Sequence, residues 1–241
     1  MSDSREDLIS NFKSHLIGLD DTFHFKCLEC GKCCKNREDI LLNSRDLFNI
    51  AKKLGLSTSQ TIKQYCETFV GHSSKMPVVR LLPTGHNRTC PLLKDGKCTV
   101  HDSKPTICAL YPIGRVIEGT QTAEMLQAAD QVKMQYILNP INCGRQKHKH
   151  TVRSWLEMFN IPIEDEFYFM WSELIIMLSS TMRGFEDRGL SRNVLDVMWQ
   201  SIGTALYAAY DVNEDFMEQF KRNHNKILEL FKSIEEKFPT V

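Results

Sequence analysis

Hydrophobic positions spaced three or four residues apart predict helices at both ends of the chain. Near the N-terminus, this spacing predicts a short amphipathic helix over residues 1–22. The apolar face of that helix would consist of Leu8, Phe12, Leu16 and Leu19. In the C-terminal part, the same spacing predicts helices over residues 152–159, 165–182, 193–210 and 213–238. The C-terminal part is therefore expected to be helical.

Capping residues predict two more helices in the first half of the chain. Residues 45–54 have helical periodicity, Ser44 precedes them, and Gly55 follows where a helix commonly stops. Ser57 and Gln60 then have the spacing of a capping box, which predicts that a second helix begins at once.

Short extended segments lie around these helices and predict a small antiparallel sheet. They are residues 39–42, 78–82, 113–118 and 121–127. Residues 83–112 carry several prolines and glycines, so little regular structure is expected there. Metal binding by Cys90, Cys98 and Cys108 would give this long segment its rigidity.

Composition narrows the class of protein. The 241 residues carry 30 basic and 30 acidic side chains, and this zero net charge gives no overall attraction to nucleic acid or to a membrane surface. Residues 167–182 are the most apolar stretch, and they are too short to span a bilayer. Residues 1–10 are polar, unlike a secretion signal. We therefore expect a cytoplasmic protein without nucleic-acid or membrane partners, and the clustered members of its nine cysteines are expected to serve metal or redox chemistry.

The segment CLECGKCC carries the first candidate ligands. Cys27, Cys30 and Cys33 are separated by two residues each, and Cys34 follows immediately. Two residues between thiolates allow a tight turn to direct both sulfurs at one ion, and Gly31 permits the positive φ that such a turn often needs. This spacing predicts a metal centre.

A second set of cysteines is spread more widely along the chain: Cys90, Cys98, Cys108 and Cys143. Side chains of adjacent residues diverge, so Cys34 is expected to serve a second centre or to be a free reactive thiol. The ninth cysteine, Cys66, falls on an apolar helix face and is predicted to belong to the core. Eight thiolates therefore remain as predicted metal ligands.

The ligand type leaves the metal open between an iron–sulfur cluster and zinc or mononuclear iron. Three cysteines at CxxCxxC with a remote Cys-Pro favour an iron–sulfur cluster of the 4Fe–4S kind, and Cys90 with Pro91 would supply that remote ligand. Structural zinc sites more often use pairs of CxxC.

Three weaker signals lie near the cysteines. His101 follows Cys98 closely and could complete a metal site. We favour the alternative that its side chain is exposed or lies beside the ligands without binding the metal. Tyr111 could donate its hydroxyl to a cluster sulfur or simply pack. The basic residues 147–150 are interpreted as a solvated loop.

Residues 25–143 resemble the CxxCxxCC zinc- or iron-chelating family, the YkgJ-like proteins. The resemblance rests on the opening CLECGKCC, on the CPLL and GKCTV stretches that begin at Cys90 and Gly96, and on KPTIC with Tyr111 and Pro112. It implies a metal-binding protein.

The same family also includes flagellin lysine N-methylases. The resemblance therefore implies, as an alternative, methyl transfer from S-adenosylmethionine to a lysine of a protein such as flagellin. The chain has no glycine-rich nucleotide loop after a strand, which argues against this alternative. A third hypothesis is a thiol redox switch at Cys33 and Cys34.

Together these observations predict an α+β protein. Residues 1–150 are expected to form a cysteine-rich metal-binding domain with a small antiparallel sheet and irregular loops organised by metal. Residues 151–241 are expected to form a helical region packed on it. The predicted function is metal binding through eight thiolates, with redox or electron-transfer chemistry.

Overall fold

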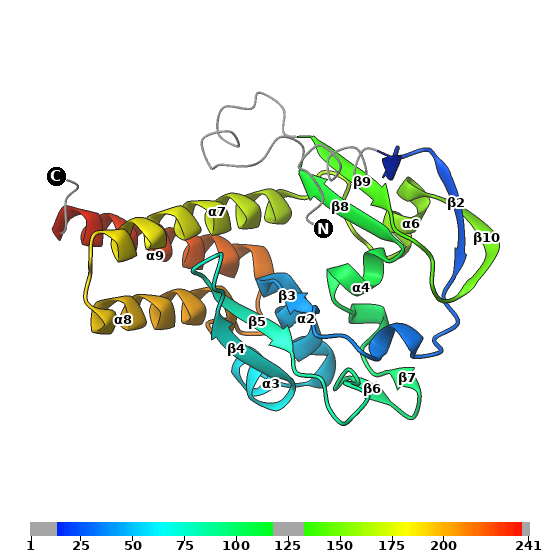
Figure 1. Cartoon of the computed structure of the whole chain (residues 1–241), viewed down its shortest axis with the longest axis horizontal. Helices are drawn as coiled ribbons and strands as arrows, with labels where there is room; N and C mark the ends of the chain where they lie inside the picture. The colour runs from blue at the N-terminus through cyan, green and yellow to red at the C-terminus, as the bar shows by residue number, and fades with distance from the viewer. Residues whose placement is uncertain (1–13, 118–132, 238–241) are drawn as a thin grey trace, which may run out of the picture.

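The computed structural model describes residues 14–117 and 133–237. Figure 1 shows the long C-terminal helices at one end and the strands β2, β8, β9 and β10 at the other. Helices α2 and α3 lie between these ends with the strands β3 to β5. The arrangement is α+β, as the sequence predicts.

The two predicted helices of the first half are present. Helix α2 (Ser44–Leu54) ends at Gly55 in the left-handed conformation with φ 67°. Helix α3 (Thr58–Tyr65) begins with the predicted capping box between Ser57 and Gln60. The cap of α2 differs from the prediction, because Asn43 accepts the hydrogen bond from the Asp46 amide at 2.8 Å. Ser44 is the first helical residue, and its hydroxyl donates to the Leu206 carbonyl.

The strands form several small antiparallel sheets. One sheet has the order β3 (Leu41–Leu42), β5 (Pro77–Leu81) and β4 (Cys66–Val70). Another has the order β1 (Leu16–Ile17), β9 (Met134–Leu138) and β8 (Ile113–Ile117). Strand β2 (Thr22–Lys26) pairs with β10 (Arg145–Thr151), and β6 (Leu93–Lys94) pairs with β7 (Lys97–Cys98). Two short helices, η2 (His101–Ser103) and α4 (Thr106–Leu110), follow β7.

The predicted N-terminal helix ends earlier than the sequence predicts: Ser14 is helical, and the residues from 15 to 22 are not. Residues 16–17 form β1, and a turn at Gly18 follows, whose amide donates to Asp21 at 2.8 Å. In β2 every second side chain is buried, so the alternation that buries Phe23 and Phe25 forms a strand. Residues 1–13 of the predicted helix and the predicted strand 121–127 lie outside the described residues.

Two further predictions need correction. Helix α3 ends at Tyr65, and Cys66 begins strand β4 instead of continuing the helix, although Cys66 is buried as expected. Residues 147–150 lie in strand β10, where Lys149 pairs with His24, instead of in a loop.

The C-terminal helices are present with shifted ends. They are α6 (Val152–Met158), α7 (Glu166–Asp187), α8 (Arg192–Gly203) and α9 (Phe216–Lys237). Helix α7 continues through Gly184, beyond the predicted end at residue 182. Helix α8 changes at Thr204 into one π-helical segment, η3 (Thr204–Ala208). No helix of the described residues is long and apolar enough to span a membrane.

Two hydrophobic cores position the cysteines. The main core joins residues of α2, β3 and β5 to residues of α7, α8 and α9, including Leu47 and Leu178, both fully buried. The aromatic core lies among β2, β8, β9 and α6 and is built around Phe23, Phe25 and Trp155. The main core therefore unites residues from both predicted domains.

Candidate metal centre

All eight predicted ligand cysteines line a single cavity of about 820 Å³. They are Cys27, Cys30, Cys33, Cys34, Cys90, Cys98, Cys108 and Cys143. Cys66 does not line this cavity and packs in the main core, as the sequence predicts. Thiols that are up to 116 positions apart in the chain thus face the same space.

A tight turn presents the first cysteines. Glu29 and Gly31 have positive φ angles of 52° and 67°, and the short 3-10 helix η1 (Lys32–Cys34) follows. The Cys34 amide donates to the Gly31 carbonyl at 3.1 Å, which closes the turn. A side chain at position 31 would also meet the Leu93 side chain at 3.2 Å, so glycine suits both the backbone and the packing.

The segment after β5 brings three more cysteines to the cavity. The Cys90 amide donates to the Cys34 carbonyl at 2.7 Å, which ties this segment to the first turn. Cys98 ends β7, and Cys108 lies in α4. The nearby Leu92 and Val100 side chains are 2% and 0% exposed and anchor this segment in the main core.

Cys143 reaches the cavity through a close contact between segments. Gly144 has a φ of 78°, and a Cβ atom there would lie 2.6 Å from the Lys26 carbonyl oxygen, so only glycine fits. The Tyr111 hydroxyl accepts from the Asn142 amide at 2.9 Å. Burial raises the pKa of the Cys143 thiol, and a hydrogen bond with the Tyr111 side chain works against this rise. Tyr111 therefore contacts a predicted ligand.

The cysteines divide between the two hydrophobic cores. Cys27 and Cys143 pack against the aromatic core. Cys90, Cys98 and Cys108 pack against the main core. The adjacent pair at positions 33 and 34 lies in η1, next to the segment that carries Cys90.

Charge around the thiols is uneven. A hydrogen bond between the Cys33 and Cys34 side chains lowers the pKa of the Cys33 thiol, and the cations Lys104 and Arg37 lower it further. The same contact raises the pKa of Cys34. Burial raises the pKa of Cys108 to about 12. Thiols with raised pKa values stay protonated near neutral pH, so metal binding there must displace protons.

The donor set fits a thiophilic metal, although the thiols are not arranged as a finished site. Among the His, Cys, Asp and Glu residues of the two described ranges, no group of three or more could hold a metal ion as placed. Rotation of cysteine side chains around one cavity is the change that binding would require, because metal binding and ordering are coupled.

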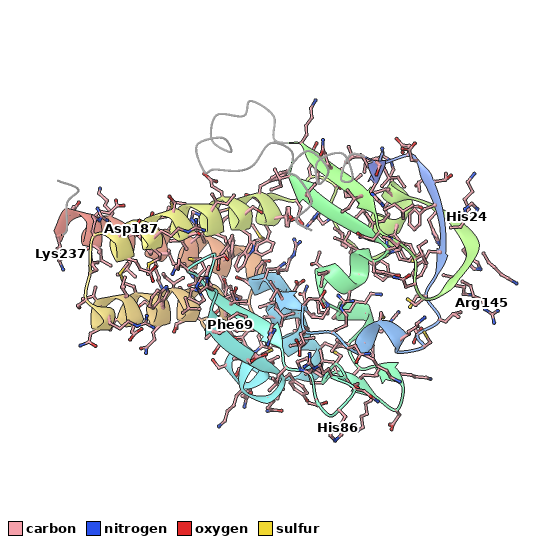
Figure 2. The ribbon with its side chains drawn as sticks, viewed as in Figure 1. His24, Phe69, His86, Arg145, Asp187 and Lys237 are labelled. Atoms are coloured by element: carbon pink, nitrogen blue, oxygen red, sulfur yellow. The ribbon has the colours of Figure 1, made fainter. Side chains whose placement is uncertain are left out.

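The candidate histidines contribute less to the site than the cysteine thiols do. His101 lines the cavity, but its Nε2 atom lies 3.9 Å from Glu29 Oε1, and its side chain is 36% exposed. Figure 2 shows His24 and Arg145 at the outer edge of the molecule, where β2 and β10 form a ribbon. His148 and His150, on β10, do not line the cavity. The histidines of this ribbon are therefore not part of the thiol site.

Sequence reasoning missed the cations at the site. Arg37 and Lys104 line the cavity beside the thiols, and Arg115 lines it from β8. The pattern of β8 contained a usable signal, because Arg115 occupies an inward position of an otherwise apolar strand between Ile113 and Ile117. A charged residue at such a position commonly has a specific partner.

Eight thiols directed into one cavity are typical of a cysteine-rich metal-binding domain. The comparison with protein families agrees. Residues 26–136 match the family described as "CxxCxxCC: Putative zinc- or iron-chelating domain", so this part of the chain is similar to that domain. Seven of the eight cavity cysteines lie within the matched residues, and Cys143 lies beyond them. Comparisons with curated proteins and with solved structures gave no match.

Proposed function

We propose that the protein binds two iron–sulfur clusters and uses them for redox or electron-transfer chemistry. The first centre would use Cys27, Cys30, Cys33 and Cys143. The second centre would use Cys34, Cys90, Cys98 and Cys108. The observation that carries this proposal is the gathering of these eight thiols, without Cys66, around one cavity.

The division into two centres is supported by the hydrophobic core on which most of the thiols pack. The pKa of Cys143 is raised first by burial and then by the charges of Cys33, Cys30 and Cys27. The pKa of Cys34 is raised by its contact with Cys33, by burial and by the charges of Cys90 and Cys98. The charge of Cys33 also raises the pKa values of Cys90, Cys98 and Cys108, so the two sets of thiols lie close together. Packing on two separate cores supports the same division.

Iron–sulfur clusters suit the spacing better than zinc. In two-cluster ferredoxins, a run of closely spaced cysteines gives three ligands to one cluster and a fourth to the other. Cys33 and Cys34 would divide in this way, because adjacent side chains diverge. The sequence Cys90-Pro91 also has the Cys-Pro form known from such clusters, although it would serve the second centre here.

The remaining residues of the site have roles that follow from their charge and position. When bound, the clusters would supply one-electron chemistry. Arg37 and Lys104 would balance the negative charge of the thiolates, since both already favour the thiolate form of Cys33. The Tyr111 hydroxyl would hydrogen-bond the Cys143 sulfur, a contact that raises cluster potential.

Oxygen-free purification followed by analysis of iron, zinc and acid-labile sulfide tests this function. We expect iron and sulfide in similar amounts, with broad visible absorption. Zinc without sulfide would contradict the cluster proposal and leave metal binding intact. A folded protein with no metal would contradict both.

Two other hypotheses from the sequence stay predictions. The comparisons give no support to lysine methylation or to S-adenosylmethionine, and incubation with that cofactor and flagellin, followed by intact mass, would test them. The contact between Cys33 and Cys34 is compatible with a thiol switch. Reversible disulfide formation in metal-free protein would favour that hypothesis.

A further inference from the structure

An arginine buried on β8 has hydrogen-bond donors without acceptors. The Arg115 side chain is 1% exposed, and its Nη1 atom pairs with Asp165 Oδ2 at 3.1 Å. Within residues 14–117 and 133–237, its Nε and Nη2 atoms have no hydrogen-bond partner, and neither does the buried Tyr136 hydroxyl. Tyr136 lies directly opposite Arg115 on β9. Because a buried donor without an acceptor is costly, these three atoms indicate a missing acceptor.

The nearest carboxylate is already shared. Arg45 binds Asp165 through two hydrogen bonds of 2.9 and 2.6 Å, so two arginines surround one buried aspartate. Asp46, a buried carboxylate that lines the cavity, accepts from the Thr106 amide and hydroxyl. One positive charge is left over among Arg45, Arg115 and Asp165. A second anion would neutralise it.

The two unpaired nitrogens of Arg115 form a fork that this chain uses elsewhere for carboxylates. Arg153 binds Asp20 through the same Nε and Nη2 atoms, at 2.9 and 3.1 Å. Arg37 binds Asp39 through the same pair. The geometry of a guanidinium fork matches the two oxygens of a carboxylate.

The cavity offers room and apolar contact beside this fork. Arg115 lines the cavity together with Tyr168, over whose ring the guanidinium lies at 3.9 Å. This stacking fixes the plane of the fork. Trp171, Ile175 and Tyr207 line the same cavity. A ligand with an acidic head and an apolar body would satisfy both features.

We propose that the cavity binds an organic acid with an aromatic or aliphatic body, whose carboxylate is held by Nε and Nη2 of Arg115. Tyr136 does not line the cavity, but its buried hydroxyl has no partner among the described residues and the residue lies opposite Arg115, so it would donate a further hydrogen bond to a carboxylate held there. This site goes beyond metal binding and does not depend on which metal the thiols hold. It would place a small molecule in the cavity that the eight cysteines line.

Calorimetric titration of the full chain, purified without oxygen, tests the proposal with two acids. Benzoate and octanoate probe an aromatic and an aliphatic body, and benzamide and octanol are their uncharged counterparts. We expect at least one acid to bind at least about tenfold more tightly than its counterpart, because charge-assisted hydrogen bonds are lost in the latter. Absence of binding by both acids, or equal binding of acid and counterpart, would overturn the proposal.

Variants locate the binding site. Arg115→Lys keeps the charge but removes the fork, and we expect affinity for the acid to fall at least about tenfold. Arg153→Lys is the matched control, since its fork is filled by Asp20 on the surface, and affinity should not change. Unchanged affinity in folded Arg115→Lys would place the acid elsewhere, for example on the metal.

Tyr136→Phe keeps the test decisive if Arg115→Lys does not fold. Removal of one hydroxyl should weaken acid binding by about threefold to tenfold, with the circular dichroism spectrum unchanged. Acid binding unaffected by this variant would contradict the site. Iron and sulfide content in Tyr136→Phe should equal that of the unmodified chain, so failure here is distinct from failure of the cluster proposal.

Discussion

The helical end of the molecule and the thiol cavity are held together by different forces. In the helical end, Phe167, Leu178 and Phe185 are at most 1% exposed and pack with other apolar side chains. Around the cavity, Cys30 and Cys33 are exposed. Residues 83–112 form only very short helices and strands there. Apolar burial stabilises the first region on its own. The second region has only a few apolar anchors, such as Leu92 and Val100, beside its thiols, so its order should depend on metal.

Metal removal should have the largest effect and should affect only one region. Structural metal binding is worth on the order of 10 kcal/mol in small cysteine-rich sites. A chelator should therefore loosen residues 83–112 while α7 and α9 keep their structure. Amide hydrogen exchange measures both regions in one sample. Equal loss of protection in the helices would show that the two regions are not independent.

Substitution of one ligand sharpens the comparison further. Cys98→Ser should remove the second centre, so that the protein retains about half of its metal. Cys66→Ser is the matched control, because that thiol is buried in the main core and does not line the cavity. Elemental analysis of the two variants measures the difference. Equal metal loss from Cys66→Ser would mean that the nine cysteines are wrongly divided.

A large-to-small substitution in the helical end should lower stability and leave the metal content unchanged, the reverse of the result expected for ligand substitution. Phe167 is 1% exposed and contacts Phe216 and Phe220. Phe167→Ala should lower the free energy of unfolding by about 3–5 kcal/mol. Metal content should stay unchanged, as judged by thermal unfolding and elemental analysis together. Val197→Ala, at a side chain that is 62% exposed, serves as the control with little effect.

The smallest effect is expected at a helix cap. The Ser57 hydroxyl accepts from the Gln60 amide at 3.1 Å. Ser57→Ala should lower the free energy of unfolding by about 1 kcal/mol, with no change in metal content. Urea unfolding measures this change in the free energy of unfolding. A much larger loss would indicate that α3 supports more than its own first turn.

Local sequence signals predicted what local forces determine. The capping box at Ser57, the stop at Gly55 and the periodic C-terminal helices were readable because their causes lie within a few residues. The spacing from Cys27 to Cys34 was readable for the same reason. The core role of Cys66 was also predicted correctly.

Features that depend on distant contacts were not readable. Strand β2 exists because β10 pairs with it, 119 residues away at Arg145 and Lys26. The packing of Cys27 and Cys143 on one core and of Cys90, Cys98 and Cys108 on the other follows from the fold, and no spacing encodes it. The inward position of Arg115 in β8 was a readable signal, but its neighbours Asp165 and Tyr136 approach it only in the folded chain.

X-ray absorption at the iron edge, on protein purified without oxygen, tests the thiol-bound clusters most directly. We predict that sulfur alone surrounds the iron and that a second iron lies nearby, as in a cluster. Iron surrounded by oxygen and nitrogen, or protein that holds zinc and no iron, would contradict the proposal.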